Sequence, residues 1–253
     1  MNTSLKKALR WLLVVPAVLV VAIIGFVIWG LTPLGPEPDA LAALQSDSLV
    51  KVELADEGWV FTPASGEATR GLVFYPGGRV DVRSYAPYAR AVAEQGFVVV
   101  MSPMPLSLAV LDANAADRAI ERHPEVTGWA LSGHSLGGAM IAQYAAENLD
   151  AIDGLVLLAS YPPNTANLAQ SGLTVASLVG TQDSVIDREN LRSARPLLPS
   201  DTSYLDIAGG NHAQFGDYGE QPGDTANPDM SAAEQRAIAV DETVRVLRDG
   251  RGR

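Results

Sequence analysis

A serine set among glycines, where a strand is expected to give way to a helix, restricts the fold of this chain more than any other feature. The motif spans Gly133–Gly138 and reads GHSLGG, with Ser135 at its centre. The residues Thr127–Leu131 before it predict a strand, and Leu136–Asn148 after it predict a helix. A junction this tight strains the serine backbone and admits only small neighbours, so the pattern predicts a nucleophile elbow. A helix start capped by a serine is the alternative.

The rest of the chain alternates short apolar runs with helical patterns, which is typical of α/β folds. We expect a mostly parallel twisted sheet with helices on both faces over residues 46–253, without a large cap domain. Residues 162–172 are a candidate lid. The remaining predicted strands are Lys51–Leu54 and Trp59–Thr62, which form a hairpin, then Leu72–Tyr75, Phe97–Met101, Leu155–Ala159, Val175–Val179 and Tyr204–Ile207. The remaining predicted helices are Tyr85–Gln95, Ser107–Arg122 and a last helix opened by a capping box of Ser231 and Glu234.

A serine hydroxyl needs a general base to become a nucleophile, and the chain has three histidines. His134 adjoins Ser135, and consecutive side chains in an elbow point apart. His123 precedes a proline at a helix end. His212 follows the last predicted strand, in a loop from which a base can reach the elbow, so we predict His212 as the base.

An acidic group is expected to orient the imidazole of His212. Asp183 comes directly after the predicted strand Val175–Val179, and Asp187 is the nearby alternative. Asp183 is preferred because it falls in the turn that follows the strand. The order Ser135, Asp183, His212 then places each residue after its own strand, at one edge of the sheet.

Backbone amides are expected to bind the oxyanion. The N–H of Leu136 opens the helix after the serine, and the glycine-containing loop 76–81 offers Gly78 or Arg79 as a second donor. Met104, Leu106 and Phe215 are candidates for lining an acyl pocket, or for packing in the core instead. The sequence holds no acidic and histidine cluster with the spacing of metal ligands, and it predicts no cofactor.

These motifs together resemble the α/β-hydrolase superfamily, and more closely the bacterial alpha/beta hydrolase fold-5 domain group. The resemblance is carried by Phe74–Asp81, Gly133–Gly138, Gly180–Asp183 and Gly209–Gly219, and it covers roughly residues 70–250. It implies the fold and a catalytic triad of Ser135, Asp183 and His212. It constrains the substrate only weakly. Dienelactone hydrolases are related in shape but usually carry a cysteine nucleophile, whereas this chain has no cysteine.

A separate signal lies at the start of the chain, where Trp11–Leu31 contains no charged residue. A helix of this length spans about 30 Å, close to the thickness of a bilayer core. The basic residues Lys6, Lys7 and Arg10 precede it, which predicts a cytoplasmic N-terminus over residues 1–10 and a catalytic domain outside the cytoplasm. A cleaved signal peptide is the alternative. Residues 32–45, rich in proline at first, are expected to form a linker.

The charge distribution excludes one class of partner. Lys6, Lys7 and Arg10 are the only charged residues before Glu37, so the chain from there on holds 15 basic and 29 acidic residues, a net charge of −14. Binding to nucleic acid needs clustered basic residues and is not expected. The sequence therefore predicts a membrane-anchored serine hydrolase for small ester substrates, most simply a carboxylesterase. An acyltransferase with the same triad and a non-catalytic membrane-anchored binding module are the alternatives.

Overall fold

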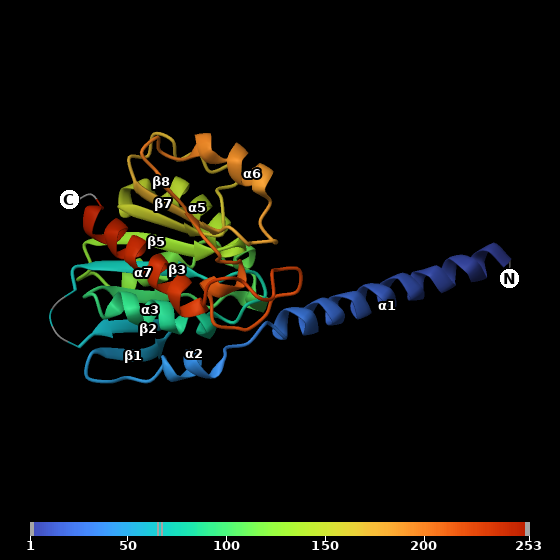
Figure 1. The fold of residues 1–253 in the computed structure, drawn as a ribbon. Helices are drawn as coiled ribbons and strands as arrows, with labels where there is room; N and C mark the ends of the chain where they lie inside the picture. Colours follow the sequence, from blue (N-terminus) through green and yellow to red (C-terminus); the bar gives the residue numbers. More distant parts are fainter. Residues whose placement is uncertain (1–2, 65, 67, 251–253) are drawn as a thin grey trace.

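An eight-stranded sheet forms the centre of the computed structural model, which describes residues 3–64, 66 and 68–250, with side chains from Val14 onward (Figure 1). The strand order is β1-β2-β4-β3-β5-β6-β7-β8. The β1–β2 and β2–β4 pairs are antiparallel, which confirms the predicted hairpin, and the remaining pairs are parallel. The strands are β1 (Val50–Ala55), β2 (Gly58–Pro63), β3 (Arg70–Tyr75), β4 (Val98–Met101), β5 (Gly128–His134), β6 (Gly154–Leu158), β7 (Thr174–Gly180) and β8 (Ser203–Ile207).

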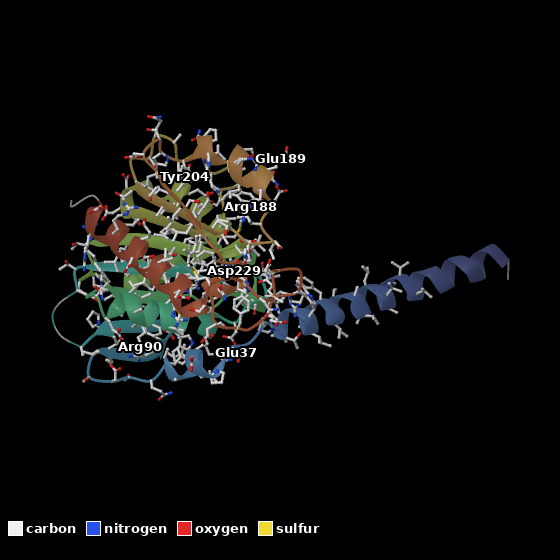
Figure 2. All side chains as sticks on the ribbon, in the orientation of Figure 1. Glu37, Arg90, Arg188, Glu189, Tyr204 and Asp229 are labelled. Atoms are coloured by element: carbon white, nitrogen blue, oxygen red, sulfur yellow. The ribbon has the colours of Figure 1, made fainter. Side chains whose placement is uncertain are left out.

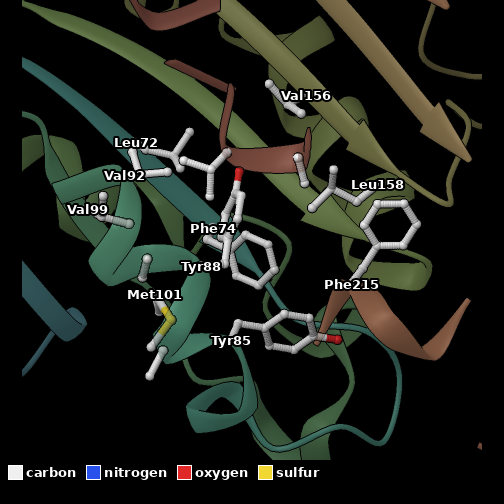
Figure 3. Close-up of a cluster of buried hydrophobic side chains, with 14 of the residues drawn as sticks. Leu72, Phe74, Tyr85, Tyr88, Val92, Val99, Met101, Val156, Leu158 and Phe215 are labelled. Atoms are coloured by element: carbon white, nitrogen blue, oxygen red, sulfur yellow. The ribbon is translucent and has the colours of Figure 1, made fainter. Parts of the chain in front are cut away.

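Helices cover both faces of the sheet. Alternate strand residues point to opposite faces, and because residues on both sides are apolar, each face packs against helices. Leu72 and Phe74 of β3 belong to the apolar cluster under α3 and α7, part of which is drawn in Figure 3. Val73 and Tyr75 belong to the cluster under α4 and α5. The helices are α1 (Thr3–Leu31), α2 (Pro38–Ala42), α3 (Ala86–Ala93), α4 (Ala116–Arg122), α5 (Leu136–Glu147), α6 (Arg188–Ser193) and α7 (Ala232–Asp249). The expected α/β architecture is thereby confirmed.

The predicted capping box is present at the start of α7. The Ser231 hydroxyl accepts the amide of Glu234, and the Glu234 carboxylate accepts the Ser231 amide at 2.9 Å. The prediction of one helix over Ser107–Arg122 is wrong. Two short 3₁₀ turns, Pro105–Ser107 and Ala109–Leu111, precede α4. The physical reason is that Leu108 and Asp112, inside the predicted range, have φ of −129° and −151° with ψ of 108° and 61°, which a continuous α-helix excludes.

The first helix projects away from the domain as a single rod, and most of its length stands clear of the rest of the molecule (Figures 1 and 2). Its segment Val14–Leu31 is long and apolar enough to cross a membrane. The side chains of Lys6, Lys7, Arg10 and Trp11, on which the predicted orientation depends, lie outside the described side chains.

The segment expected to be a linker lies against the domain. Leu34 pairs with Val80 in a parallel β-bridge, and the amide of Glu37 donates to the carbonyl of Asp217 at 2.9 Å. Ala40 of α2 is fully buried. Residues 34–43 therefore form part of the folded domain, and the extended chain between it and α1 is only a few residues long.

Candidate functional site

Ser135 occupies a strained turn between β5 and α5, with φ of 51° and ψ of −122°. The three glycines around it have no room for a side chain. A Cβ on Gly133 would lie 2.7 Å from the backbone of Gly137, one on Gly137 would lie 2.3 Å from the Pro76 carbonyl oxygen, and one on Gly138 would lie 2.5 Å from Ser160. The predicted elbow geometry is therefore present, and close packing accounts for each glycine.

Hydrogen bonds fix the backbone of this turn from the neighbouring strand. The Ser135 amide donates to the Leu158 carbonyl at 3.0 Å, and the Ser160 hydroxyl donates to the Ser135 carbonyl at 2.7 Å. Ser160 was not predicted from the sequence. The sequence shows only a small hydroxyl residue just after β6, the neighbour of β5, and this pattern is too common to indicate a role.

Asp183 and His212 meet in the interior, as predicted. Oδ2 of Asp183 lies 2.8 Å from Nδ1 of His212, and both side chains are almost fully buried. The other carboxylate oxygen accepts the amides of Val185 and Ile186 at 2.9 and 2.8 Å. Burial opposes the charged carboxylate, but the bonds from His212 and the two amides outweigh it, so the pKa of Asp183 is lowered.

The loop of His212 is held from two sides. The buried side chain of Gln235 on α7 accepts the Asn211 amide at 2.9 Å and donates to the Asn211 carbonyl at 2.8 Å. Gly180, at the end of β7, lies so close to Gly210 that a Cβ would be 2.3 Å from its carbonyl oxygen. The two loops that carry Asp183 and His212 are thus packed against each other.

Asp187, the alternative acid, has a different role. Its carboxylate accepts the amides of Glu189 and Asn190 at 2.9 and 3.0 Å and so caps α6. His123 lies beside the carboxylates of Glu57 and Glu125, at 3.2 and 3.0 Å. Neither residue is hydrogen-bonded to His212.

A pocket of about 290 Å³ brings Ser135 and His212 together. The buried Nε2 of His212 has no hydrogen-bond partner among the described residues. It is therefore the free nitrogen of the ring, opposite the one held by Asp183. The pocket is lined by Ser135, Leu136, Ala139, Ala159, Ser160, Tyr161, Val185, Ile186, Asp187 and His212. Most of these walls were missed from the sequence, because they come from α5 and from the loops after β6 and β7, which only the fold brings together.

The predicted oxyanion donors are backbone amides of the elbow and of the loop after β3. The Leu136 amide is the first of α5 and so has no acceptor within the helix. Gly78 approaches it closely, since a Cβ there would be 3.2 Å from the Leu136 side chain. The amide of Arg79 donates to the Ser107 carbonyl at 2.8 Å. Gly78 and Arg79 were the two predictions for the second donor. The Arg79 amide is already bonded to Ser107, which leaves Gly78.

The three predicted substrate-binding residues do not line this pocket. Met104 is buried in the apolar cluster under α4 and α5. Phe215 lies in the opposite cluster with Phe74, Tyr85 and Leu158 (Figure 3), its ring 5.8 Å from that of His134. Leu106 lies against Gly30 of α1. Met104 and Phe215 thus take the alternative that the sequence left open, which is packing in the core.

His134 belongs to a buried chain of hydrogen bonds whose partners the sequence did not predict. The Gly77 amide donates to the Tyr85 hydroxyl at 3.0 Å, and this hydroxyl lies 2.7 Å from Nδ1 of His134. The hydroxyl has one proton and two lone pairs, so it can accept the Gly77 amide and still either donate to Nδ1 or accept a proton from it. Burial, followed by the proximity of His212, lowers the pKa of His134 well below its usual value, so the ring stays neutral.

Metal ligands are not gathered at this site. Within residues 3–64, 66 and 68–250, no group of three or more His, Cys, Asp or Glu side chains is placed to hold a metal ion.

Comparison with known proteins identifies the family. The model of the alpha/beta hydrolase family matches residues 71–237, a span that includes the elbow and both loops of Asp183 and His212. The chain belongs to the alpha/beta hydrolase family. A search of curated proteins finds no match.

Solved structures support the same fold. A predicted CIB-like hydrolase from Thermoplasma acidophilum superposes with a TM-score of 0.59 at 14% identity, over 78% of this chain and 98% of the other. TT1662 from Thermus thermophilus gives 0.57 at 14%, over 80% and 99%. Carboxyl esterase 2 from the fungus Tuber melanosporum gives 0.55 at 14%, over 80% and 88%. At this identity the likeness establishes the alpha/beta hydrolase fold alone.

Proposed function

We propose that this alpha/beta hydrolase is a membrane-anchored serine hydrolase that cleaves carboxylic esters. One observation carries the proposal: His212 is held by Asp183 on one nitrogen, while its free nitrogen belongs to the pocket that contains Ser135. This arrangement is what a serine nucleophile needs, because the hydroxyl must lose its proton as it attacks.

In the first half of the reaction, Oγ of Ser135 attacks the ester carbonyl and its proton passes to Nε2 of His212. The buried carboxylate of Asp183 stabilises the imidazolium that forms. The carbonyl oxygen becomes an oxyanion beside the amides of Leu136 and Gly78. The imidazolium then protonates the alkoxy oxygen, the C–O bond breaks, and the alcohol leaves an acyl group on Ser135.

In the second half, water enters the open pocket and His212 takes one of its protons. The hydroxide attacks the acyl carbonyl, the same amides bind the second oxyanion, and the proton returns to Oγ of Ser135. The products are a carboxylic acid and the regenerated serine. The sum is ester plus water to alcohol plus acid.

The membrane part of the proposal rests on α1. Most side chains of its apolar stretch Val14–Leu31 are exposed, and such a surface is unfavourable in water. The basic residues before it favour a cytoplasmic N-terminus and a domain on the other side. Extraction of membranes with alkaline carbonate, combined with the intact mass of the protein, distinguishes an anchor from a cleaved signal peptide.

The catalytic part is tested with a fluorophosphonate probe and p-nitrophenyl esters of increasing acyl length. We expect the probe to label Ser135, and Ser135→Ala to lose both labelling and turnover. Turnover that persists in Ser135→Ala would overturn the mechanism. A folded wild-type protein that neither reacts with the probe nor cleaves any ester would favour the non-catalytic binding module instead.

A further inference from the structure

The end of α1 touches the loops that surround the candidate site. The guanidinium of Arg79 lies 4.4 Å from the centre of the Trp29 ring. Gly30 lies so close to Leu106 that a Cβ would be 2.6 Å from the Leu106 Cβ. Shortly after, the Leu34 amide donates to the Arg79 carbonyl at 2.8 Å. The apolar helix therefore ends directly on the loops that follow β3 and β4.

The pocket opens at this same edge of the sheet. Ser135, Asp183 and His212 each follow the carboxyl end of a parallel strand, β5, β7 and β8, and these ends lie on the side from which α1 departs (Figure 1). Gly78 connects the two features, since it precedes Arg79 in the chain and packs on Leu136. Few residues therefore separate the helix end from the serine.

Exposed apolar side chains occur at this edge outside the helix. Val110 and Leu111 are 56% and 50% exposed, in the 3₁₀ turn that follows Leu106 and packs beside α5. Val185 is 40% exposed and lines the pocket itself. With a net charge of −14 from residue 37 onward, the domain has no electrostatic attraction to an anionic surface. The attraction of this edge to a bilayer would therefore come from its exposed apolar side chains.

We propose that, with α1 in a bilayer, this edge rests on the membrane surface and the pocket takes its substrates from the adjacent leaflet, as acyl esters of membrane lipids. This inference rests on the proposed serine hydrolase and names its substrate class. Hydrolysis consumes one water per ester and yields a fatty acid and the deacylated lipid. A pocket of about 290 Å³ suits this use, because most of an acyl chain can stay in the bilayer while its ester group enters the site.

The contact with the membrane is testable by depth measurement, and the absence of natural cysteine makes the labels unambiguous. Full-length Leu111→Cys is labelled with an environment-sensitive fluorophore and placed in phosphatidylcholine vesicles containing spin-labelled lipid. Leu49→Cys is the matched control. Leu49 is 60% exposed, and it precedes the Val50–Pro63 pair at the opposite edge of the sheet.

We expect the spin-labelled lipid to quench the label at position 111 at least about twofold more than the label at position 49, since only the former would reach the interface. Equal quenching at the two positions would overturn the proposed orientation.

The substrate class is testable with a spacer. Twenty Gly and Ser residues inserted between Thr32 and Pro33 span roughly 25 Å and release the domain from a fixed position at the membrane. The same spacer placed ahead of Thr3 is the control, because it leaves the junction between α1 and the domain unchanged. In phosphatidylcholine vesicles we expect the first insertion to lower release of fatty acid about tenfold, by loss of the fixed orientation. Turnover of soluble p-nitrophenyl butyrate should stay unchanged.

The outcomes separate the two proposals. If the wild-type protein cleaves the soluble ester but releases no fatty acid from vesicles, or if the spacer leaves that release unaffected, the lipid proposal fails and the serine hydrolase stands. If the wild-type protein cleaves neither ester and does not react with the fluorophosphonate probe, the proposed function itself fails.

Discussion

The hydroxyl of Tyr85 lies 2.7 Å from Nδ1 of His134, in a fully buried position behind the candidate serine. The hydroxyl also accepts the Gly77 amide, so a single side chain joins the oxyanion loop to the histidine of the elbow. The rings of His134 and His212 are 4.6 Å apart. The Tyr85 hydroxyl thus links the backbone of Gly77 to the imidazole of His134, whose ring lies beside that of the proposed base, His212.

Replacing Tyr85 with phenylalanine tests this link. The substitution leaves the Gly77 amide and Nδ1 of His134 without their partner, so we expect a loss of about 1–3 kcal/mol in the free energy of unfolding. We also expect kcat on p-nitrophenyl butyrate to fall with little change in KM, because the oxyanion loop loses a fixed contact. Urea unfolding and steady-state kinetics measure the two effects.

Tyr88→Phe is the matched control for that experiment. Its hydroxyl is equally buried but bonds to Ser132 and Thr243, away from His134. Burial, moderated by these bonds, raises the pKa of Tyr88 to about 12. We expect a similar stability loss and an unchanged kcat. If both variants lower kcat alike, the effect reports general destabilisation rather than the Tyr85–His134 contact.

The buried His134 should make stability depend on pH. Its pKa is lowered in the folded protein, so below the unfolded value of 6.5 the unfolded chain binds a proton that the folded chain does not. Above pH 6.5 neither state binds this proton, so the neutral ring costs no stability. As the pH falls below 6.5, the free energy of unfolding declines by about 1.4 kcal/mol per pH unit until the folded pKa is reached. Urea titrations from pH 7.5 to 5 should reveal this slope in the wild-type protein. His134→Asn should have a smaller slope, and an identical slope would contradict the assignment.

Asp183 and Asp187 allow a direct test of which carboxylate supports His212. Asp183→Asn removes the charge that stabilises the imidazolium, and we expect kcat to fall by about 10³- to 10⁴-fold. Asp187→Asn should leave stability nearly unchanged, because asparagine caps a helix as well as aspartate does. It should lower kcat far less than Asp183→Asn, because Asp187 lines the pocket but is not bonded to His212. Measured kcat values that fall in Asp187→Asn but not in Asp183→Asn would reverse the assignment.

The elbow glycines should tolerate no side chain. In Gly137→Ala the added Cβ would meet the carbonyl oxygens of Pro76 and Tyr75 at 2.3 and 2.4 Å, against backbone that cannot rotate away. We expect a loss of about 3 kcal/mol or more in the free energy of unfolding, with loss of probe labelling. Gly35→Ala is the control, since a Cβ there has nothing within 4 Å. Thermal melts of both variants measure the difference in stability, and equal melting temperatures would contradict the prediction.

The sequence predicted the site's framework because its signals are local. A serine between a strand and a helix, an acidic residue after a strand and a histidine after the last strand each depend on a few neighbouring residues. The same holds for the capping box of α7. The strand order was not predicted, because only the folded sheet shows which strands are neighbours.

Long-range contacts account for what the sequence did not predict. Tyr85 reaches His134 across 49 positions, and Gln235 holds the loop of His212 from the last helix. The non-helical conformations of Leu108 and Asp112 break an otherwise helical pattern, shortly after the loop meets Gly30 at Leu106. Each depends on distant parts of the chain that local patterns do not encode.

The pairing of Leu34 with the loop 79–81 has a practical consequence. Both backbone groups of Leu34 are bonded there, its amide to Arg79 and its carbonyl to Asp81. A water-soluble version of the domain should therefore begin no later than Thr32. Trimming to residue 46 would remove the bridge and the buried Ala40, and would leave the edge beside the oxyanion loop open to solvent.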